Sequence, residues 1–218
     1  MKTKRKALLL TFCAVLLVVA SVLGTIAYLT SQDEVKNTFT VGRVAIKLDE
    51  AKVNLDGTLV EGADRVQKNS YKLLPGHTYI KDPMVTVLKG SESSYIKMTV
   101  TFTKANELDA IFAPDGAKLM KIFNGYSENE WTYKGNTKNT TANTRTYEFW
   151  YKDAVGAPIA DVKLDALFDF ITVPSTINND QLKNIEGMTI TVNAYAIQAD
   201  GFETAEKAWA AFPEGTTP

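Results

Sequence analysis

The stretch Ile96-Lys97-Met98-Thr99-Val100-Thr101-Phe102-Thr103 alternates apolar and polar side chains without interruption. Successive side chains of a β-strand point to opposite faces, so this alternation predicts a strand with one buried and one exposed face. The same pattern recurs in Val44-Ala45-Ile46-Lys47-Leu48 and from Ile190 to Ala196. Runs rich in β-branched and aromatic residues predict three further strands, at Thr78–Leu88, Thr146–Lys152 and Leu167–Val173. The chain is therefore predicted to be all-β.

Turn-forming residues separate the predicted strands, at Asp56-Gly57, Pro75-Gly76, Lys89-Gly90-Ser91, Pro114-Asp115-Gly116 and Glu186-Gly187. Half-polar strands joined by turns predict an antiparallel β-sandwich rather than βαβ units. This sandwich is expected to be a single domain over residues 28–218. Pro83 lies inside one of the runs and predicts an edge position or a bulge there.

Short helices are expected at the periphery of the sandwich. Two are predicted at Glu107–Phe112 and Asn179–Ile185. A third covers residues 203–212, where one apolar face is formed by Ala205, Ala208, Trp209 and Phe212, and Pro213 ends the helix. Trp209 is expected to cap the end of the sandwich core. The polar stretch Gly125–Arg145 is predicted to be a loop or a ragged hairpin.

Composition and charge exclude several classes of function. Of the 218 residues, 45% are hydrophobic and 22% are charged, which is ordinary for a globular protein. Residues 1–27 hold four of the 24 basic residues and none of the 25 acidic ones, so the remainder carries a net charge of about −5. A mildly acidic body without a basic run argues against nucleic-acid binding. The one cysteine, Cys13, lies in the N-terminal apolar run, which excludes a disulfide scaffold and a thiol enzyme.

The N-terminus has the three parts of a secretory signal peptide. Residues 1–6 are MKTKRK, residues 7–29 are uncharged, and Thr25-Ile26-Ala27 has the small-x-small pattern of a cleavage site. A signal helix is therefore predicted over residues 1–27, with cleavage between Ala27 and Tyr28 and secretion of the body. An uncleaved signal anchor is the alternative, because the apolar run is long enough to span a bilayer. The membrane would then be contacted only through this signal.

Two motifs near the N-terminus carry a resemblance to a known family. Gly24-Thr25-Ile26-Ala27-Tyr28-Leu29-Thr30, followed by Asn37-Thr38-Phe39-Thr40-Val41-Gly42, resembles the start of the SipW-dependent secreted proteins of Gram-positive bacteria, the TasA/camelysin family. Leu74-Pro75-Gly76 before Tyr79–Pro83, and the stretch Asn193–Phe202, are also similar to that family. The resemblance implies a jelly-roll-like fold, a cell-surface or extracellular location and processing by a SipW-type signal peptidase. It does not extend over roughly residues 104–160.

The resemblance implies two functions of different classes. TasA-like members form fibres in the biofilm matrix, which implies self-assembly, with or without sibling matrix proteins. In such a fibre, residues 28–41 would add a strand to a neighbouring copy, anchored by Val35, Phe39 and Val41. The same segment can instead be the first strand of its own sandwich, because it continues almost directly into Val44. The alternative function is that of the camelysins, which are cell-surface metalloendopeptidases; an adhesin is a third possibility.

The residues themselves predict no catalytic, cofactor or metal site. His77 follows Pro75-Gly76 and is expected to be an exposed turn residue, and one histidine cannot form an HExxH zinc motif. Asp161, Asp165 and Asp169 recur every four residues without the glycine turn of a calcium loop, so a solvated face is expected. The run Ser91-Glu92-Ser93-Ser94 is expected to be a polar turn, since it lies outside any Gly-x-Ser-x-Gly elbow.

Overall fold

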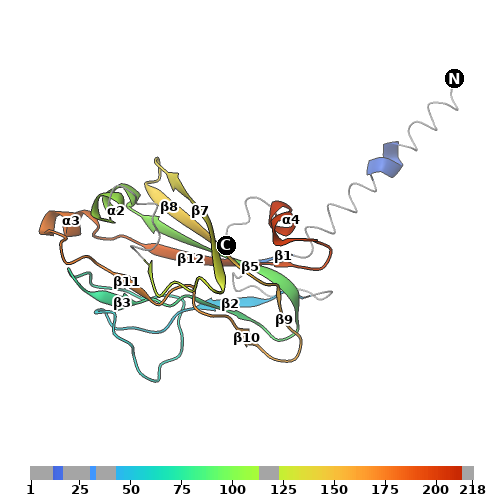
Figure 1. Cartoon of the computed structure of the whole chain (residues 1–218), viewed down its shortest axis with the longest axis horizontal. Coiled ribbons are helices and arrows are strands. Elements are labelled where there is room, and N and C mark those ends of the chain that lie inside the picture. The colour runs from blue at the N-terminus through green and yellow to red at the C-terminus, as the bar shows by residue number, and fades with distance from the viewer. Residues whose placement is uncertain (1–11, 17–29, 33–42, 113–122, 213–218) are drawn as a thin grey trace.

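The computed structural model describes residues 12–16, 30–32, 43–112 and 123–212, and this part of the chain is mostly antiparallel β-sheet with a few short helices (Figure 1). Residues 12–16 are helical. The strands are β1 (Thr30–Gln32), β2 (Ile46–Asp49), β3 (Thr78–Ile80), β4 (Met84–Val87), β5 (Ser91–Thr103), β6 (Phe123–Asn124), β7 (Trp131–Asn139), β8 (Thr144–Tyr151), β9 (Val155–Ala157), β10 (Val162–Lys163), β11 (Phe170–Thr172) and β12 (Ile190–Gln198). The helices are α2 (Ala105–Phe112), α3 (Asn179–Asn184) and α4 (Ala205–Ala210).

The strands form two layers, as the sequence predicts for an antiparallel sandwich. One layer is a sheet of order β1-β12-β5-β8-β7, with β9 also paired to β5. The other layer consists of two three-stranded sheets, β10-β4-β2 and β3-β11-β6 (Figure 1). The predicted strand Thr78–Leu88 is divided into β3 and β4 at Lys81–Pro83. Pro83 has no N–H for a ladder, and its carbonyl accepts from the Leu167 N–H at 3.0 Å.

β5 is the central strand, and its alternation is confirmed. The side chains of Ile96, Met98, Val100 and Phe102 are at most 2% exposed, whereas the threonines between them are half-buried on the outer face. The two layers meet at Phe123, whose ring centroid lies 4.4 Å from that of Phe168 and 5.5 Å from that of Phe102. Phe102 and Phe123 belong to one cluster of buried residues that includes side chains from both layers.

Two of the predicted irregular regions are part of the large sheet. The prediction of a turn at Ser91–Ser94 is wrong, because these residues begin β5. Their buried hydroxyls are satisfied: Ser91 Oγ donates to the Ala45 carbonyl at 3.0 Å and Ser94 Oγ to the Val155 carbonyl at 3.1 Å. Within Gly125–Arg145, the ragged hairpin is confirmed as β7 and β8, with a register shift between Tyr133 and Gly135.

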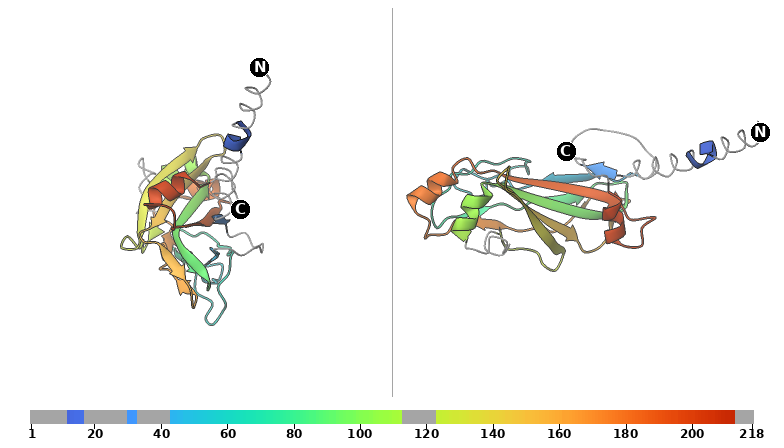
Figure 2. Two further views of the ribbon diagram at one scale, coloured as in Figure 1. Left: turned by 90° about the vertical axis from the view of Figure 1, so that its right-hand side faces the viewer. Right: turned by 90° about the horizontal axis from the view of Figure 1, so that it is seen from above.

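The three predicted helices exist, and they lie at the two ends of the large sheet. α2 and α3 are at one end and α4 is at the other (Figure 2). The expectation that Trp209 caps the main core is wrong. Trp209 is only 8% exposed, but it packs in a separate cluster with Ile197, on the outer face of the large sheet. There its ring lies 4.6 Å from Lys97 Nζ. Lys97 and Ile197 alternate with core residues along their strands, so they reach this second cluster instead.

Several N-terminal predictions fall outside the described residues. These are the cleavage site at Ala27 and Tyr28, and the anchor residues Val35, Phe39 and Val41. Within the described ranges, the structure contains no helix long and apolar enough to cross a membrane.

Candidate functional site

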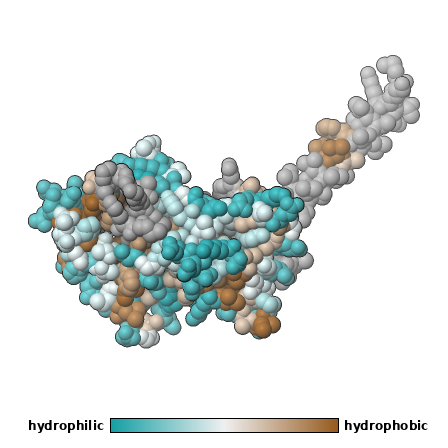
Figure 3. Space-filling view, in the orientation of Figure 1, coloured by the Kyte–Doolittle hydropathy of each residue, from teal (hydrophilic) through white to brown (hydrophobic). Residues whose placement is uncertain are grey.

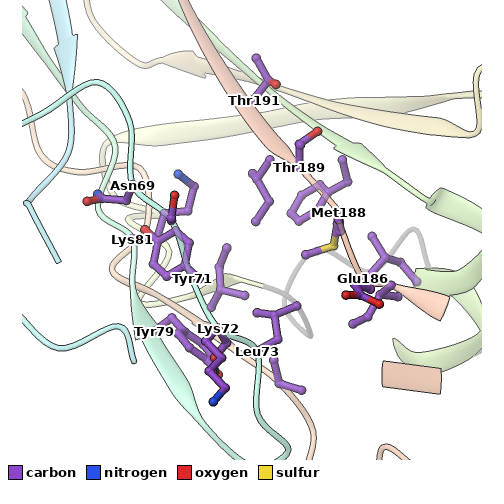
Figure 4. Close-up of a pocket in the computed structure, with 18 of the residues that line it drawn as sticks. Asn69, Tyr71, Lys72, Leu73, Tyr79, Lys81, Glu186, Met188, Thr189 and Thr191 are labelled. Carbon is purple, nitrogen blue, oxygen red and sulfur yellow. Dashed lines mark hydrogen bonds between the residues drawn. The ribbon is translucent and has the colours of Figure 1, made fainter. Parts of the chain in front are cut away.

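A large groove opens beside β12. Its volume is about 1550 Å³, which exceeds the roughly 300–1,000 Å³ of typical small-molecule sites. Figure 4 shows Tyr71 and Leu73 on one side of this space, and Met188 and Thr189, which lead into β12, on another. α2 and α3 contribute to one end of it. The apolar residues that line the groove include Leu48, Tyr71, Leu73, Phe102, Ile111, Ile177, Met188, Ile190 and Val192.

Within the described part of the chain, most of the outer edge of β12 along this groove has no strand partner. The Thr189 carbonyl accepts from the Thr103 N–H at 3.1 Å, and the Ala199 N–H donates to the Ser93 carbonyl at 2.8 Å. Odd-numbered residues of β12 therefore direct their backbone groups toward β5, and even-numbered residues direct theirs to the opposite side. On that opposite side β1 pairs only with residues Tyr195–Ile197. The N–H and C=O groups of Ile190, Val192 and Ala194 thus face no strand of the described part of the chain.

The wall opposite β12 belongs to the long connection between β2 and β3, and Arg65 fixes its base. The Arg65 guanidinium binds the Asp49 carboxylate at 2.6 Å and the Asp82 carboxylate at 2.7 Å. It also donates to the carbonyls of both aspartates, at 3.2 and 2.8 Å. Burial by itself would lower the pKa of Arg65, but the bonds to Asp82 and Asp49 hold this pKa above its usual value. Arg65 therefore attaches the connection to the last residue of β2 and to Asp82, just before β4.

A buried ion pair lies next to these contacts of Arg65. Lys81 Nζ and Glu50 Oε2 are 2.5 Å apart, and the two residues are 6% and 7% exposed. The Asn69 amide donates to Glu50 Oε1 at 2.9 Å and to the Ala51 carbonyl at 2.8 Å, which positions the start of the wall. Burial, and next the Glu50 carboxylate, raise the pKa of Tyr71, so Tyr71 stays a neutral donor to the Ile80 carbonyl at 3.1 Å.

The candidate residues singled out from the sequence do not meet in this groove. His77 is exposed at its turn, with its ring 6.3 Å from that of Tyr79. Asp161 Oδ1 accepts from the Lys89 N–H at 2.7 Å, while Asp165 and Asp169 are also exposed. Over the described ranges, no three His, Cys, Asp or Glu residues are grouped so as to hold a metal ion. Ser91 and Ser94 are held by the bonds to neighbouring strands described above.

The sequence alone did not predict the groove or the contacts of Arg65 with Asp49 and Asp82. The signal that could have indicated the wall is the alternation Asn69-Ser70-Tyr71-Lys72-Leu73, which lies outside every predicted strand. Arg65, Asp49 and Asp82 are separated by up to 33 residues, so their contact depends on tertiary structure. Three kinds of comparison, with protein-family models, with curated proteins and with solved structures, find no match to this chain.

Replacing Arg65 by Met is predicted to destabilise the protein strongly, because it leaves the buried Asp49 carboxylate and the Asp82 carboxylate without their shared partner. Removing one member of a fully buried pair costs about 3–5 kcal/mol, and the loss here is expected at the lower end of that range because the Arg65 side chain is 26% exposed. Lys47→Met is the matched control, since Lys47 also binds Asp49, at 2.9 Å, but its side chain is 52% exposed. This control is expected to lose less than about 1 kcal/mol. Urea unfolding of both variants measures the difference, and equal losses would refute the role given to Arg65.

Proposed function

We propose that this chain is a secreted structural protein that polymerises by strand exchange, with the groove beside β12 as its acceptor site. The observation that carries the proposal is the edge of Ile190, Val192 and Ala194, which no described strand pairs, beside a large and mostly apolar groove. An open edge over a core can be completed by an extended segment, whose backbone pairs with the edge while alternate side chains enter the groove. The size of the groove favours such a segment over a small molecule.

The ten residues between Gln32 and Arg43 are too few to reach Ile190 and return while β1 remains in place. Gln32 pairs with Tyr195, and the carbonyl of Arg43 accepts from the Glu92 N–H at 2.8 Å, beyond the other end of β1. An extended chain needs about five residues to go from the position beside Tyr195 to the position beside Ile190. It needs about ten more to come back to the position of Arg43, beside Glu92. Residues 33–42 provide only ten in total. A strand beside Ile190 must therefore come from elsewhere, and we propose residues 28–41 of a second copy.

The register of β1 indicates how such a segment would fit. Ser31 pairs with Ala196, a core-facing residue of β12. If the donor also takes the place of the acceptor's own β1, which is then free to pair with the next copy, this antiparallel register would place Val35 opposite Val192 and Asn37 opposite Ile190. Because side chains alternate, Val35, Phe39 and Val41 would all lie on the same face as Ser31 and point into the groove. The three anchor residues expected from the sequence therefore share the face that this proposal requires.

Location and family belong to the same proposal. The signal peptide and the resemblance to the TasA/camelysin family support an extracellular protein of the cell surface or biofilm matrix, released by a SipW-type peptidase. The two-layer antiparallel fold supports a jelly-roll-like subunit. Head-to-tail exchange does not close on itself, so it gives filaments rather than dimers. Sibling matrix proteins could offer the same donor segment to the same edge.

The assembly prediction uses two variants of the mature chain with complementary defects. Deleting residues 28–41 removes the donor and leaves the groove, whereas Val192→Asp places a carboxylate in the groove and leaves the donor. Each variant alone is expected to be a folded monomer, and an equimolar mixture is expected to form a 1:1 heterodimer by analytical ultracentrifugation. Asn193→Asp, on the outer face of the same strand and not among the residues that line the groove, is the matched control and should still polymerise into fibres visible by negative-stain microscopy.

Three results would count against strand exchange. The mixture could remain monomeric although both proteins are folded by circular dichroism. The deletion could unfold the chain, which would assign residues 28–41 to their own sandwich. Chelator-sensitive proteolysis by purified protein that never forms fibres would support the metalloendopeptidase instead.

The secreted protein is predicted to begin at Tyr28, because the small residues Thr25 and Ala27 suit a signal-peptidase pocket and the following Tyr28 and Leu29 do not. N-terminal sequencing of protein from the culture supernatant measures this. Recovery of the intact N-terminus in the membrane fraction would instead indicate a signal anchor.

A further inference from the structure

The segment Asn69–Leu73, which faces the groove, has the local pattern of a strand but no strand partner. Asn69, Tyr71 and Leu73 are half-buried, and Ser70 and Lys72 between them are exposed. Tyr71 and Leu73 pack against the main core. Such a period of two is that of an extended chain with one face on a core. The segment is nevertheless outside every sheet of the described structure.

Hydrogen bonds hold this segment on one side at Lys72 and at both of its ends. The Lys72 N–H donates to the Leu55 carbonyl at 2.7 Å, and the Lys72 carbonyl accepts from the Tyr79 hydroxyl at 2.8 Å. The same hydroxyl accepts from the Leu74 N–H at 2.6 Å, which holds the C-terminal end. The N-terminal end is held by the Asn69 amide through Glu50 and Ala51.

The other side of the segment is open. In an extended chain, neighbouring residues direct their backbone groups to opposite sides, so Tyr71 and Leu73 direct theirs away from Leu55 and Tyr79. Within the described part of the chain, no hydrogen bond reaches the backbone N–H or C=O groups of Tyr71 and Leu73. Both residues line the same groove as Ile190 and Val192 (Figure 4). The groove therefore has an unpaired backbone on two of its walls.

We propose that Asn69–Leu73 is a second acceptor edge, which becomes a strand when the groove is filled. The incoming partner is residues 28–41 of a second copy, so this inference rests on the proposed function. The donor would form hydrogen bonds to β12 on one side and to Tyr71 and Leu73 on the other. A strand bonded on both sides leaves none of its backbone groups unsatisfied in the core, and it exposes no new edge to further chains.

Residue-resolved hydrogen exchange tests this second edge. The mature chain, kept dilute enough to remain monomeric, is measured by NMR with and without a synthetic peptide of residues 28–41. We expect the amides of Tyr71 and Leu73 to exchange at least about tenfold more slowly with the peptide, together with those of Ile190, Val192 and Ala194. The Lys72 amide is the internal control, because its bond to Leu55 exists in both states and its rate should not change.

The two proposals fail in different ways in this experiment. Slower exchange along β12 with unchanged rates at Tyr71 and Leu73 would overturn the second edge and leave strand exchange intact. Unchanged rates at both edges with saturating peptide would overturn both proposals. Equal slowing at Lys72, Tyr71 and Leu73 would also overturn the second edge, because it would indicate general stabilisation of the connection rather than new bonds on one side.

Discussion

The architecture depends on the requirement that every buried backbone polar group be hydrogen-bonded. β5 meets this requirement along most of its length, because β12 pairs with it on one side and β8 on the other. Among the described strands, β12 is paired along its length only by β5, and the three residues of β1 cover a third of its outer edge. The apolar side chains beneath that edge, including Val192 and Met188, are left half-buried in consequence. A sandwich that is complete at its centre and incomplete at one edge is suited to bind an extended chain.

The opposite wall of the groove is built from polar contacts rather than from a sheet. Arg65 and the buried Glu50–Lys81 pair hold the connection between β2 and β3 against the ends of the short strands. Charged groups at these positions are costly to bury unless their partners are present. The Arg65 guanidinium donates to four acceptors, a carboxylate oxygen and a carbonyl on each of Asp49 and Asp82, and Lys81 binds Glu50. On the face drawn in Figure 3, polar residues predominate and apolar patches lie along the lower border. Among the exposed apolar residues of the described chain, Leu55 and Ile159 are 61% and 83% exposed.

Much of the fold could be predicted from the sequence, because period two in β5 and β12 and the turn residues are local signals. The helices α2 and α3 were predictable for the same reason. The start of β5 is predicted as a turn because a polar run with serines is typical of turns. Its hydroxyls bind the carbonyls of Ala45 and Val155, which only the tertiary structure brings near. The groove could not be predicted, because an unpaired edge is defined by which strands are absent beside it, and Arg65 meets Asp82 only through tertiary structure. The motifs at residues 24–42 indicate a donor segment, whereas the acceptor is indicated only by the pairing of the β12 backbone at Ile190 and Val192.

Disulfide trapping between two different single-cysteine proteins tests the central claim most directly, since the chain after residue 27 has no cysteine of its own. One mature protein carries Ile190→Cys, and a second carries Asn37→Cys, with Val35→Cys and Phe39→Cys as neighbours in register. A disulfide between two differently tagged chains can only be intermolecular. Paired residues of adjacent antiparallel strands lie about 5.5 Å apart between Cα atoms, within reach of a disulfide. Strand exchange in this register predicts a covalent heterodimer that is most abundant with Asn37→Cys. The absence of a heterodimer with all three donor variants would contradict it.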